Sequence, residues 1–297
     1  MEMFTQQMIN ALIIGSFYAL IALGYSMVYG IIKLLNFAHG DLYMVGAFVG
    51  FAVLSLFGGG TGLLGVVVAF FAALLFGGLL GIGIERVAYR PLLSSPRLTI
   101  LITAVGVSLV LENGVMKSFG PSFKVYPVQL PTEGFQIFGA TLTYAQILII
   151  LLSVLLMTAL HLFVTRSLYG KAMRAISIDH AATSLMGIPV TRIISLTFFI
   201  GSSLAAASGM MAGMYYGQIS FMMGFIVGLK AFTAAVIGGI GSIPGAMLGG
   251  LVLGLLESFG TVWLGSEWKD VFAFSILILI LVLKPTGLLG ENVTERM

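Results

Sequence analysis

Long apolar stretches separated by short polar segments make up almost all of this chain. Stretches without a charged residue cover 3–32, 42–84, 98–111, 134–165, 193–229, 231–256 and 271–283. An α-helix needs about 20 apolar residues to cross the hydrocarbon core of a bilayer. The apolar residues are continuous and do not alternate with polar ones, so the pattern predicts helices and excludes a transmembrane β-barrel. The fold class expected is an all-α polytopic membrane protein.

About eight hydrophobic helical segments follow from these stretches. Five single helices are expected near 8–32, 98–116, 142–165, 193–216 and 265–283, two more between 42 and 84 with a Gly-rich boundary at 58–62, and a broken or re-entrant pair at 231–262. Residues 117–141 contain three prolines and are expected to form a loop. The chain is expected to be a single transmembrane domain over residues 1–297.

Two segments interrupt apolar runs and predict broken helices. Residues 33–41 bring Lys, Asn, His and Asp into one such run, and residues 238–245 contain four glycines and a proline. In a helix interior a glycine costs about 1 kcal/mol and a proline about 3 kcal/mol. Irregular backbone at membrane depth is tolerated only where it is buried in protein or lines a cavity. The two breaks lie early and late in the chain, which suggests two inverted halves.

Composition supports a membrane protein and excludes several other classes. Charged residues make up 8 % of the chain, hydrophobic residues 59 %, and the mean hydropathy is +1.11. Soluble domains carry roughly 25 % charged residues, so a soluble enzyme, a nucleic-acid-binding domain and a disordered chain are excluded. Membrane lipid is the expected surrounding. Cysteine is absent, which excludes disulfides and thiolate metal sites.

The basic residues predict an orientation in the membrane. Seven of the fourteen Lys and Arg residues lie in segments 85–97 and 166–192: Arg86, Arg90, Arg97, Arg166, Lys171, Arg174 and Arg192. By the positive-inside rule both segments are cytoplasmic. Loop 117–141 is then extracytoplasmic, the N-terminus lies outside and the C-terminus lies in the cytoplasm. The net charge of +3 is a topology signal and does not indicate nucleic-acid binding.

Polar and glycine residues at the breaks are candidate residues of a translocation pathway. The candidates are Asn36, His39, Asp41, Gly238, Gly239, Gly241 and Ser242. Helix N-termini at a break would favour a carboxylate, and unwound carbonyl groups would favour an ammonium group. The alternative is a packed kink that binds no ligand.

Glu257 is a further candidate because it is an acid inside an apolar stretch. At bilayer depth such a residue must pair, protonate or face water. A functional and a structural interpretation are both open, and Glu257 would be only a modestly buried cap if 246–262 ends near the outer surface.

Several catalytic motifs are missing from the sequence. It contains no Gly-x(4)-Gly-Lys-[Ser/Thr], no His-Glu-x-x-His and no Gly-x-Ser-x-Gly. The chain therefore carries no phosphate-binding loop of its own, and we expect neither enzymatic activity, nor a cofactor, nor a metal. A transport role is what the pattern favours.

Segment 166–192 is long, basic and predicted to be cytoplasmic. Asp179 can cap a short helix over 180–186 that ends at Gly187, with Pro189 two residues beyond. Ala181, Ala182, Leu185 and Met186 would supply its apolar contacts. Such a helix is suited to docking a cytosolic partner, although the segment alone would equally fit a helix lying at the lipid headgroups.

Four motifs together resemble the permease subunits of branched-chain amino acid ABC importers, most closely the H-type subunit of the Liv system. They are Asn36-Phe37-Ala38-His39-Gly40-Asp41, Gly170-Lys171-Ala172-Met173-Arg174, Gly238-Gly239-Ile240-Gly241-Ser242-Ile243-Pro244-Gly245 and Lys284-Pro285-Thr286-Gly287-Leu288-Leu289-Gly290. The resemblance runs essentially from end to end. It implies a pore shared with a second, M-type permease, two cytosolic ATP-binding subunits and a periplasmic amino-acid-binding protein.

The resemblance also implies that loop 166–192 couples the permease to the ATPase. Its candidate coupling residues are Gly170, Arg174, Asp179, Ala181, Ala182 and Gly187. ABC permeases often show Glu-Ala-Ala-x(3)-Gly at this place, whereas this chain has Ala181-Ala182-Thr183-x(3)-Gly187 and lacks the Glu. Asp179 or Arg174 would then supply the polar contact.

The function expected is inward transport of Leu, Ile or Val across the bacterial inner membrane, powered by separate ATPase subunits. Two alternatives are an ABC permease for urea or short amides and a self-sufficient secondary carrier or channel.

Overall fold

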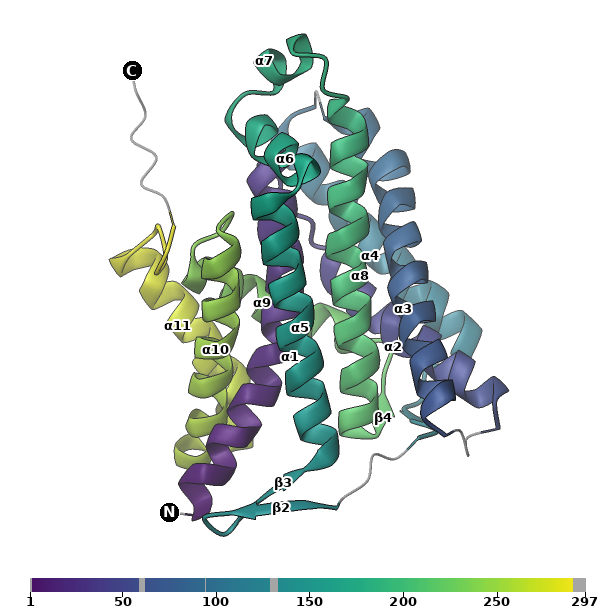
Figure 1. The fold of residues 1–297 in the computed structure, drawn as a ribbon, viewed down its shortest axis with the longest axis vertical. Coiled ribbons are helices and arrows are strands. Elements are labelled where there is room, and N and C mark those ends of the chain that lie inside the picture. Colours follow the sequence, from purple (N-terminus) through teal and green to yellow (C-terminus); the bar gives the residue numbers. More distant parts are fainter. Residues whose placement is uncertain (1, 59–61, 94, 129–132, 291–297) are drawn as a thin grey trace.

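The computed structural model describes residues 2–58, 62–93, 95–128 and 133–290. It is an all-α bundle (Figure 1). Its helices are α1 (Glu2–Ile32), α2 (His39–Leu56), α3 (Leu63–Ile84), α4 (Arg97–Phe119), α5 (Tyr144–Arg166), α6 (Leu168–Ile178), α7 (His180–Leu185), α8 (Val190–Tyr216), α9 (Met223–Gly238), α10 (Ile243–Leu264) and α11 (Lys269–Leu283). Helix α3 continues through a π-helical turn, η1 (Glu85–Tyr89), and a 3-10 turn, η2 (Arg90–Leu92); a further 3-10 turn, η3 (Ser266–Trp268), precedes α11. Within the described residues, seven helices are long and apolar enough to cross a membrane.

Among the described residues, four short strands lie outside the helices. Strand β1 (Lys124–Val125) pairs antiparallel with β4 (Gln218–Ile219), and β2 (Gly134–Ile137) pairs antiparallel with β3 (Ala140–Thr143). The β2–β3 hairpin and the start of α1 lie at one end of the bundle, and α6 and α7 lie at the other (Figure 1). We call these the hairpin end and the α7 end. Segments 117–141 and 166–192, predicted on opposite sides of a membrane, therefore lie at opposite ends.

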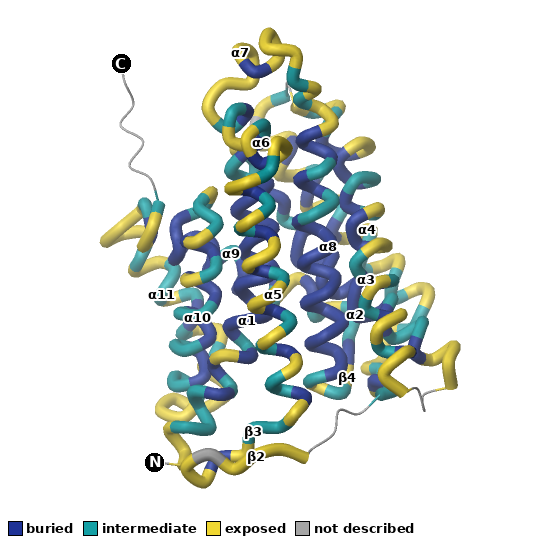
Figure 2. The backbone as a smooth tube through the Cα atoms, in the orientation of Figure 1, coloured by how far each residue is buried: buried dark blue, intermediate teal, exposed yellow. Residues whose placement is uncertain are grey.

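Helices α1 and α8 form the centre of the bundle. Both are buried along most of their length, while many residues of α5 and α11 are exposed (Figure 2). The exposed residues of α3, α4, α5 and α11 include many large apolar ones. Exposed apolar surface of this extent is unfavourable in water and suits the hydrocarbon of a bilayer. The fold is therefore that of a polytopic membrane protein, as predicted.

Two three-helix units, α1–α2–α3 and α8–α9–α10, are arranged as an inverted repeat. Helix α1 lies antiparallel to α8, since the Ser208 hydroxyl of α8 bonds to the Phe17 carbonyl while Gly201 lies against Gly24. The third helix of each unit packs closely on the first helix of the other: α10 on α1 and α3 on α8, through glycines. Small residues permit this close approach.

The equivalent reversals are 33–38 and 217–222. Each follows the first long helix of its unit and returns the chain to the middle of the bundle, where α2 or α9 begins. Two inverted halves are therefore present, but the prediction that segment 238–245 is the counterpart of 33–41 is wrong. The end of this helix at residue 216 was predicted, but 217–222 was not recognised as a reversal because it contains neither charge nor proline; Gly217 follows α8 with φ of 68°.

The broken pair near 231–262 is present with different bounds. Helix α9 begins at Met223, eight residues before the predicted start of the pair. Lys230, which was taken as the end of an apolar stretch, is buried inside this helix. Residues 239–242 break the helix, with positive φ at Gly239 and Gly241, and the Ser242 side chain then accepts the N–H of Gly245 to cap α10. Helix α10 has 22 residues and is long enough to span, so the short member of the pair is α9, with 16.

Candidate functional site

The N-termini of α2 and α9 meet in the middle of the bundle. A Cβ atom placed on Gly40 would lie 2.5 Å from the carbonyl oxygen of Gly224 and 2.5 Å from the Cα of Gly228. Such distances are shorter than Cβ contacts allow, so only glycine permits this approach of the two backbones. The contact is made between residues near the starts of the two helices, and we call it the α2/α9 junction.

Both helix N-termini at the junction lack a side-chain cap. The N-cap residues, Ala38 for α2 and Met222 for α9, supply no side-chain hydrogen bond to the first turn. The first N–H groups of a helix have no partner within it and carry the positive end of the helix dipole. The two positive helix ends lie side by side at the junction, where the carboxylate of Asp41, in the first turn of α2, lies against Gly224.

The structure brings the predicted residues Asn36, His39 and Asp41 to this junction. All three are buried, with at most 2 % of each residue exposed. His39 packs edge-on against the Tyr25 ring, and neither of its ring nitrogens has a hydrogen-bond partner among the described residues. The Asp41 carboxylate interacts with the Ser108 hydroxyl, but neither carboxylate oxygen forms a hydrogen bond of regular geometry. Unpaired polar groups at such depth are rare in proteins, and their role in a pathway stays a prediction.

Glu257 is the centre of a buried ion-pair network. Its Oε1 accepts from Lys230 Nζ at 3.2 Å and lies 2.6 Å from Lys269 Nζ, and its Oε2 accepts from the Tyr18 hydroxyl at 2.7 Å. Lys230 Nζ also lies 2.5 Å from Asp270 Oδ1. The Glu257 side chain is fully buried, so the interpretation as a modestly buried cap is wrong. Of the three possibilities for an acid at this depth, pairing, protonation and exposure to water, pairing is the one realised.

The four predicted residues of the second break lie away from the α2/α9 junction. Gly238, Gly239, Gly241 and Ser242 form the turn between α9 and α10. Residues 284–290 cover this turn: the N–H of Leu288 donates to the Ile237 carbonyl at 2.8 Å and that of Leu289 to the Gly238 carbonyl at 2.9 Å. These contacts cap the C-terminus of α9. A pathway role for the four residues stays a prediction.

The loop 166–192 forms two short helices whose ends follow the predicted local signals. The Asp179 carboxylate accepts the N–H groups of Ala181 and Ala182 at 2.8 and 3.0 Å and so caps α7, and Gly187 follows α7 with φ of 80°. Ser167 caps α6 by accepting the N–H of Gly170. The Arg174 guanidinium donates to the Val164 carbonyl at the end of α5.

The outer part of this loop presents apolar side chains. Ile178, Leu185 and Met186 are 87 %, 90 % and 79 % exposed, at the α7 end of the molecule. The loop also contacts the transmembrane helices, because a ring nitrogen of His180 lies 2.9 Å from the Ile31 carbonyl, at the end of α1. Helix α7 therefore contacts the segment that leads into the first reversal.

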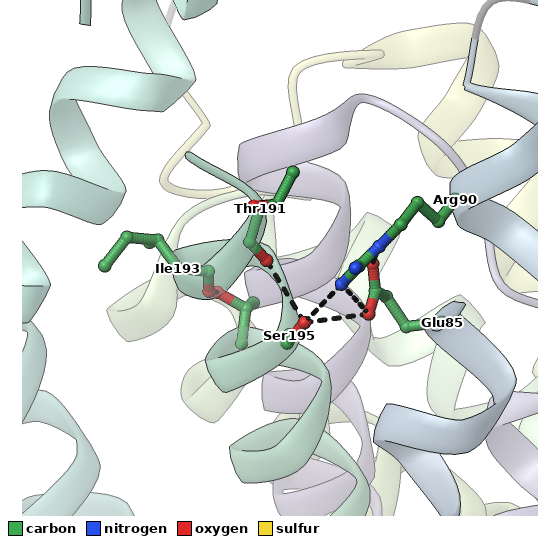
Figure 3. A network of polar contacts seen from close by, with 6 residues as sticks. Glu85, Arg90, Thr191, Ile193 and Ser195 are labelled. Carbon is green, nitrogen blue, oxygen red and sulfur yellow. Dashed lines mark hydrogen bonds and ion pairs between the residues drawn. The ribbon is translucent and has the colours of Figure 1, made fainter. Parts of the chain in front are cut away.

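A polar cluster joins the end of α3 to the start of α8 (Figure 3). Arg90 donates two hydrogen bonds to the Glu85 carboxylate, each of 2.9 Å, and a third of 2.8 Å to the Ser195 hydroxyl. The Ser195 hydroxyl lies 2.8 Å from Glu85 Oε2. Bidentate pairing of this kind is strong and directional. It fixes the π-helical turn η1 to α8, which directly follows loop 166–192.

Comparison with known proteins shows the family. A family model described as the permease component of branched-chain amino acid transport systems matches residues 7–281. The high-affinity branched-chain amino acid transport system permease protein BraD of Pseudomonas aeruginosa is 48 % identical, over 99 % of this chain and 98 % of the relative. The corresponding LivH protein of Escherichia coli K12 is 46 % identical, over 99 % and 97 %.

The chain belongs to the family of branched-chain amino acid transport system permeases. The resemblance inferred from the sequence motifs is thereby confirmed. Among solved structures, PsaBC from Streptococcus pneumoniae in complex with Fab is similar to this permease with a TM-score of 0.51 and 13 % identity, covering 96 % of this chain and 93 % of that one. At this identity the likeness concerns the fold alone.

Sequence reasoning missed Lys230, Lys269 and Tyr18 of this permease. Lys230 was taken as the end of an apolar stretch, although a lone lysine and the lone Glu257 in neighbouring stretches could have been paired, since charges within a membrane seek partners. Glu85 and Arg90 were read only as loop charges. Their pairing depends on the π-helical turn η1, and no motif in the sequence predicts such a turn.

Proposed function

We propose that this permease is the transmembrane subunit of an ABC importer that moves Leu, Ile or Val into the cell. The observation that carries the proposal is the similarity along almost the whole chain to relatives described as high-affinity branched-chain amino acid permeases. The two helix N-termini that meet inside the bundle at the α2/α9 junction support it, because broken helices within the membrane are typical of transport pathways.

The energy for transport would come from separate subunits. The sequence has no phosphate-binding loop, so ATP is hydrolysed by two cytosolic ATP-binding subunits that dock on α7. Ile178, Leu185 and Met186 supply an exposed apolar contact of the kind that a partner's groove buries. A second, M-type permease completes the pore, and a periplasmic binding protein delivers the amino acid at the hairpin end.

This assignment requires one orientation in the bacterial inner membrane. The α7 end, with the basic segments 85–97 and 166–192, is cytoplasmic, and the N-terminus lies in the periplasm. The absence of cysteine makes a direct test possible. In intact spheroplasts an impermeant maleimide should label Phe135→Cys, in the hairpin, and should label Ser184→Cys, in α7, only after the membrane is opened. The reverse pattern would overturn the proposal.

The function itself is tested by uptake of radiolabelled leucine into proteoliposomes. We expect uptake that requires the second permease, the ATP-binding subunits, the binding protein and ATP, and that excess isoleucine or valine inhibits. Uptake of urea or a short amide that leucine does not inhibit would show a different cargo. Uptake driven by an ion gradient with this chain alone would show a secondary carrier.

A further inference from the structure

A cavity of about 300 Å³ lies between the α2/α9 junction and the hairpin end. Its wall is formed by α1, α2, Phe123 before β1, the end of α8, the reversal 217–222, α9 and the first residue of α11. Phe17, Met223 and Val227 line its apolar part, and Lys230 and Lys269 line it as the charged residues. The volume is at the lower end of the range for small-molecule sites, which suits a ligand with few heavy atoms.

The charges around this cavity are unevenly solvated. The side chains of Glu257 and Lys230 are 0 % and 5 % exposed and that of Lys269 is 31 % exposed, whereas that of Asp270 is 51 % exposed. The three more buried groups together carry one net positive charge. The carboxylate of Asp270 balances this positive charge. Of the four charged groups it is the most exposed, so water can solvate it when its contact with Lys230 is broken.

From this arrangement we infer that the cavity is a binding site for the α-carboxylate of the transported amino acid, with Lys230 and Lys269 as its ligands. The inference rests on the proposed function and specifies where the substrate binds. The carboxylate of the amino acid replaces Asp270 at Lys230 Nζ, and Asp270 turns to solvent. Its branched side chain occupies the apolar part of the cavity lined by Phe17, Met223 and Val227.

Glu257 has a different part in this site. It binds Lys269, Lys230 and the Tyr18 hydroxyl at the same time, so it holds the two ammonium groups close to each other against their repulsion. It is a positioning residue and does not leave the network when the substrate binds. Asp270 is the exchangeable counter-ion because it contacts Lys230 alone among the ion pairs of the described residues.

A thiol-protection experiment tests the site in the assembled permease–ATPase complex without energised transport. Val227→Cys introduces a single thiol at the cavity wall, and Ile226→Cys, the neighbouring residue outside the lining, is the control. Leucine should slow the reaction of Val227→Cys with a small maleimide and leave that of Ile226→Cys unchanged. Isopentylamine, which lacks the carboxylate, should not protect.

Three further substitutions in the Val227→Cys background separate substrate binding from a merely structural network. Lys230→Gln should raise the half-protecting leucine concentration about tenfold or more, the range for a hydrogen bond to a charged group. Lys230→Arg should preserve protection. Asp270→Asn should lower the half-protecting concentration, because it weakens the competing counter-ion. A structural network predicts instead that Lys230→Gln and Asp270→Asn both impair protection.

The outcomes distinguish this site from the proposed function. Leucine uptake by the wild-type complex without protection of Val227→Cys, or with the same half-protecting concentration in Lys230→Gln, overturns the site and leaves the function standing. A wild-type complex that transports no branched-chain amino acid overturns the proposed function. The site is established if leucine protects Val227→Cys and if the half-protecting leucine concentration rises in Lys230→Gln and falls in Asp270→Asn.

Discussion

The Tyr89 hydroxyl donates a hydrogen bond of 2.7 Å to the side-chain oxygen of Asn36. Tyr89 is the last residue of η1, and Asn36 belongs to the reversal 33–38 that precedes α2. Glu85 and Arg90 bind Ser195 at the start of α8, so the backbone of η1 connects two separate polar contacts, one to α8 and one to the reversal. A displacement of α8 would reach the α2/α9 junction through these contacts.

Removal of this hydroxyl tests the connection. In Tyr89→Phe the ring remains packed, but the buried Asn36 side chain loses its hydrogen-bond donor, and its Nδ2 already has no partner among the described residues. We expect a loss of about 1–3 kcal/mol of stability, seen as a lower melting temperature, together with reduced leucine uptake. Tyr169→Phe, at an exposed tyrosine stacked on Phe163, is the control. Equal melting temperatures for the two variants would contradict the expectation.

The α2/α9 junction should be intolerant of a single methyl group. In Gly40→Ala the new Cβ would overlap backbone atoms of Gly224 and Gly228, and backbone cannot move aside as a flexible side chain can. We expect poor assembly and loss of uptake, because overpacking costs about 1–3 kcal/mol or more. Gly106→Ala, in α4, meets no atom within 4 Å and should express normally. Unimpaired uptake by Gly40→Ala would show that the two helix N-termini are not in close contact.

Charge balance around Glu257 should be essential for stability. Glu257→Gln leaves Lys230 and Lys269 near each other without their shared carboxylate. Breaking a buried ion pair in this way costs about 3–5 kcal/mol, and we expect a corresponding fall in the midpoint of thermal unfolding. The exposed Glu267→Gln is the matched control. Adding Lys269→Gln to Glu257→Gln should recover part of the lost stability. If the double variant lost as much stability as the two single variants added together, the result would argue against a coupled network.

The cap of α7 should affect coupling to ATP hydrolysis. Asp179→Ala removes the oxygen that accepts the Ala181 and Ala182 N–H groups, which costs about 1 kcal/mol at a helix N-terminus. With docking on α7, the complex should hydrolyse ATP with less leucine uptake per ATP. Asp179→Asn keeps a capping oxygen and should retain coupling. The same uptake per ATP in both variants and the wild type would dissociate α7 from coupling.

The sequence by itself predicted the features that depend on neighbouring residues. Continuous apolar stretches indicated membrane helices because crossing the hydrocarbon sets a minimum length. The start of α7 at Asp179 and its end before Gly187 were predicted because a cap is formed within three or four positions of the residue that provides it. A break within 238–245 was likewise predicted from the local cost of glycine and proline in a helix, and the structure places it at 239–242.

The tertiary structure decided which distant residues meet. Residues that meet in the fold are far apart in the chain, as are Gly40 and Gly228, or Tyr18 and Glu257. The sequence of a membrane helix does not indicate which other helix it will contact. The inverted repeat depends on a chain reversal at 217–222, and this segment contains neither a charged residue nor a proline. Packing of α1 against α10 and of α3 against α8 places these residues. The ion pairs, the α2/α9 junction and the cavity beside it follow from that packing.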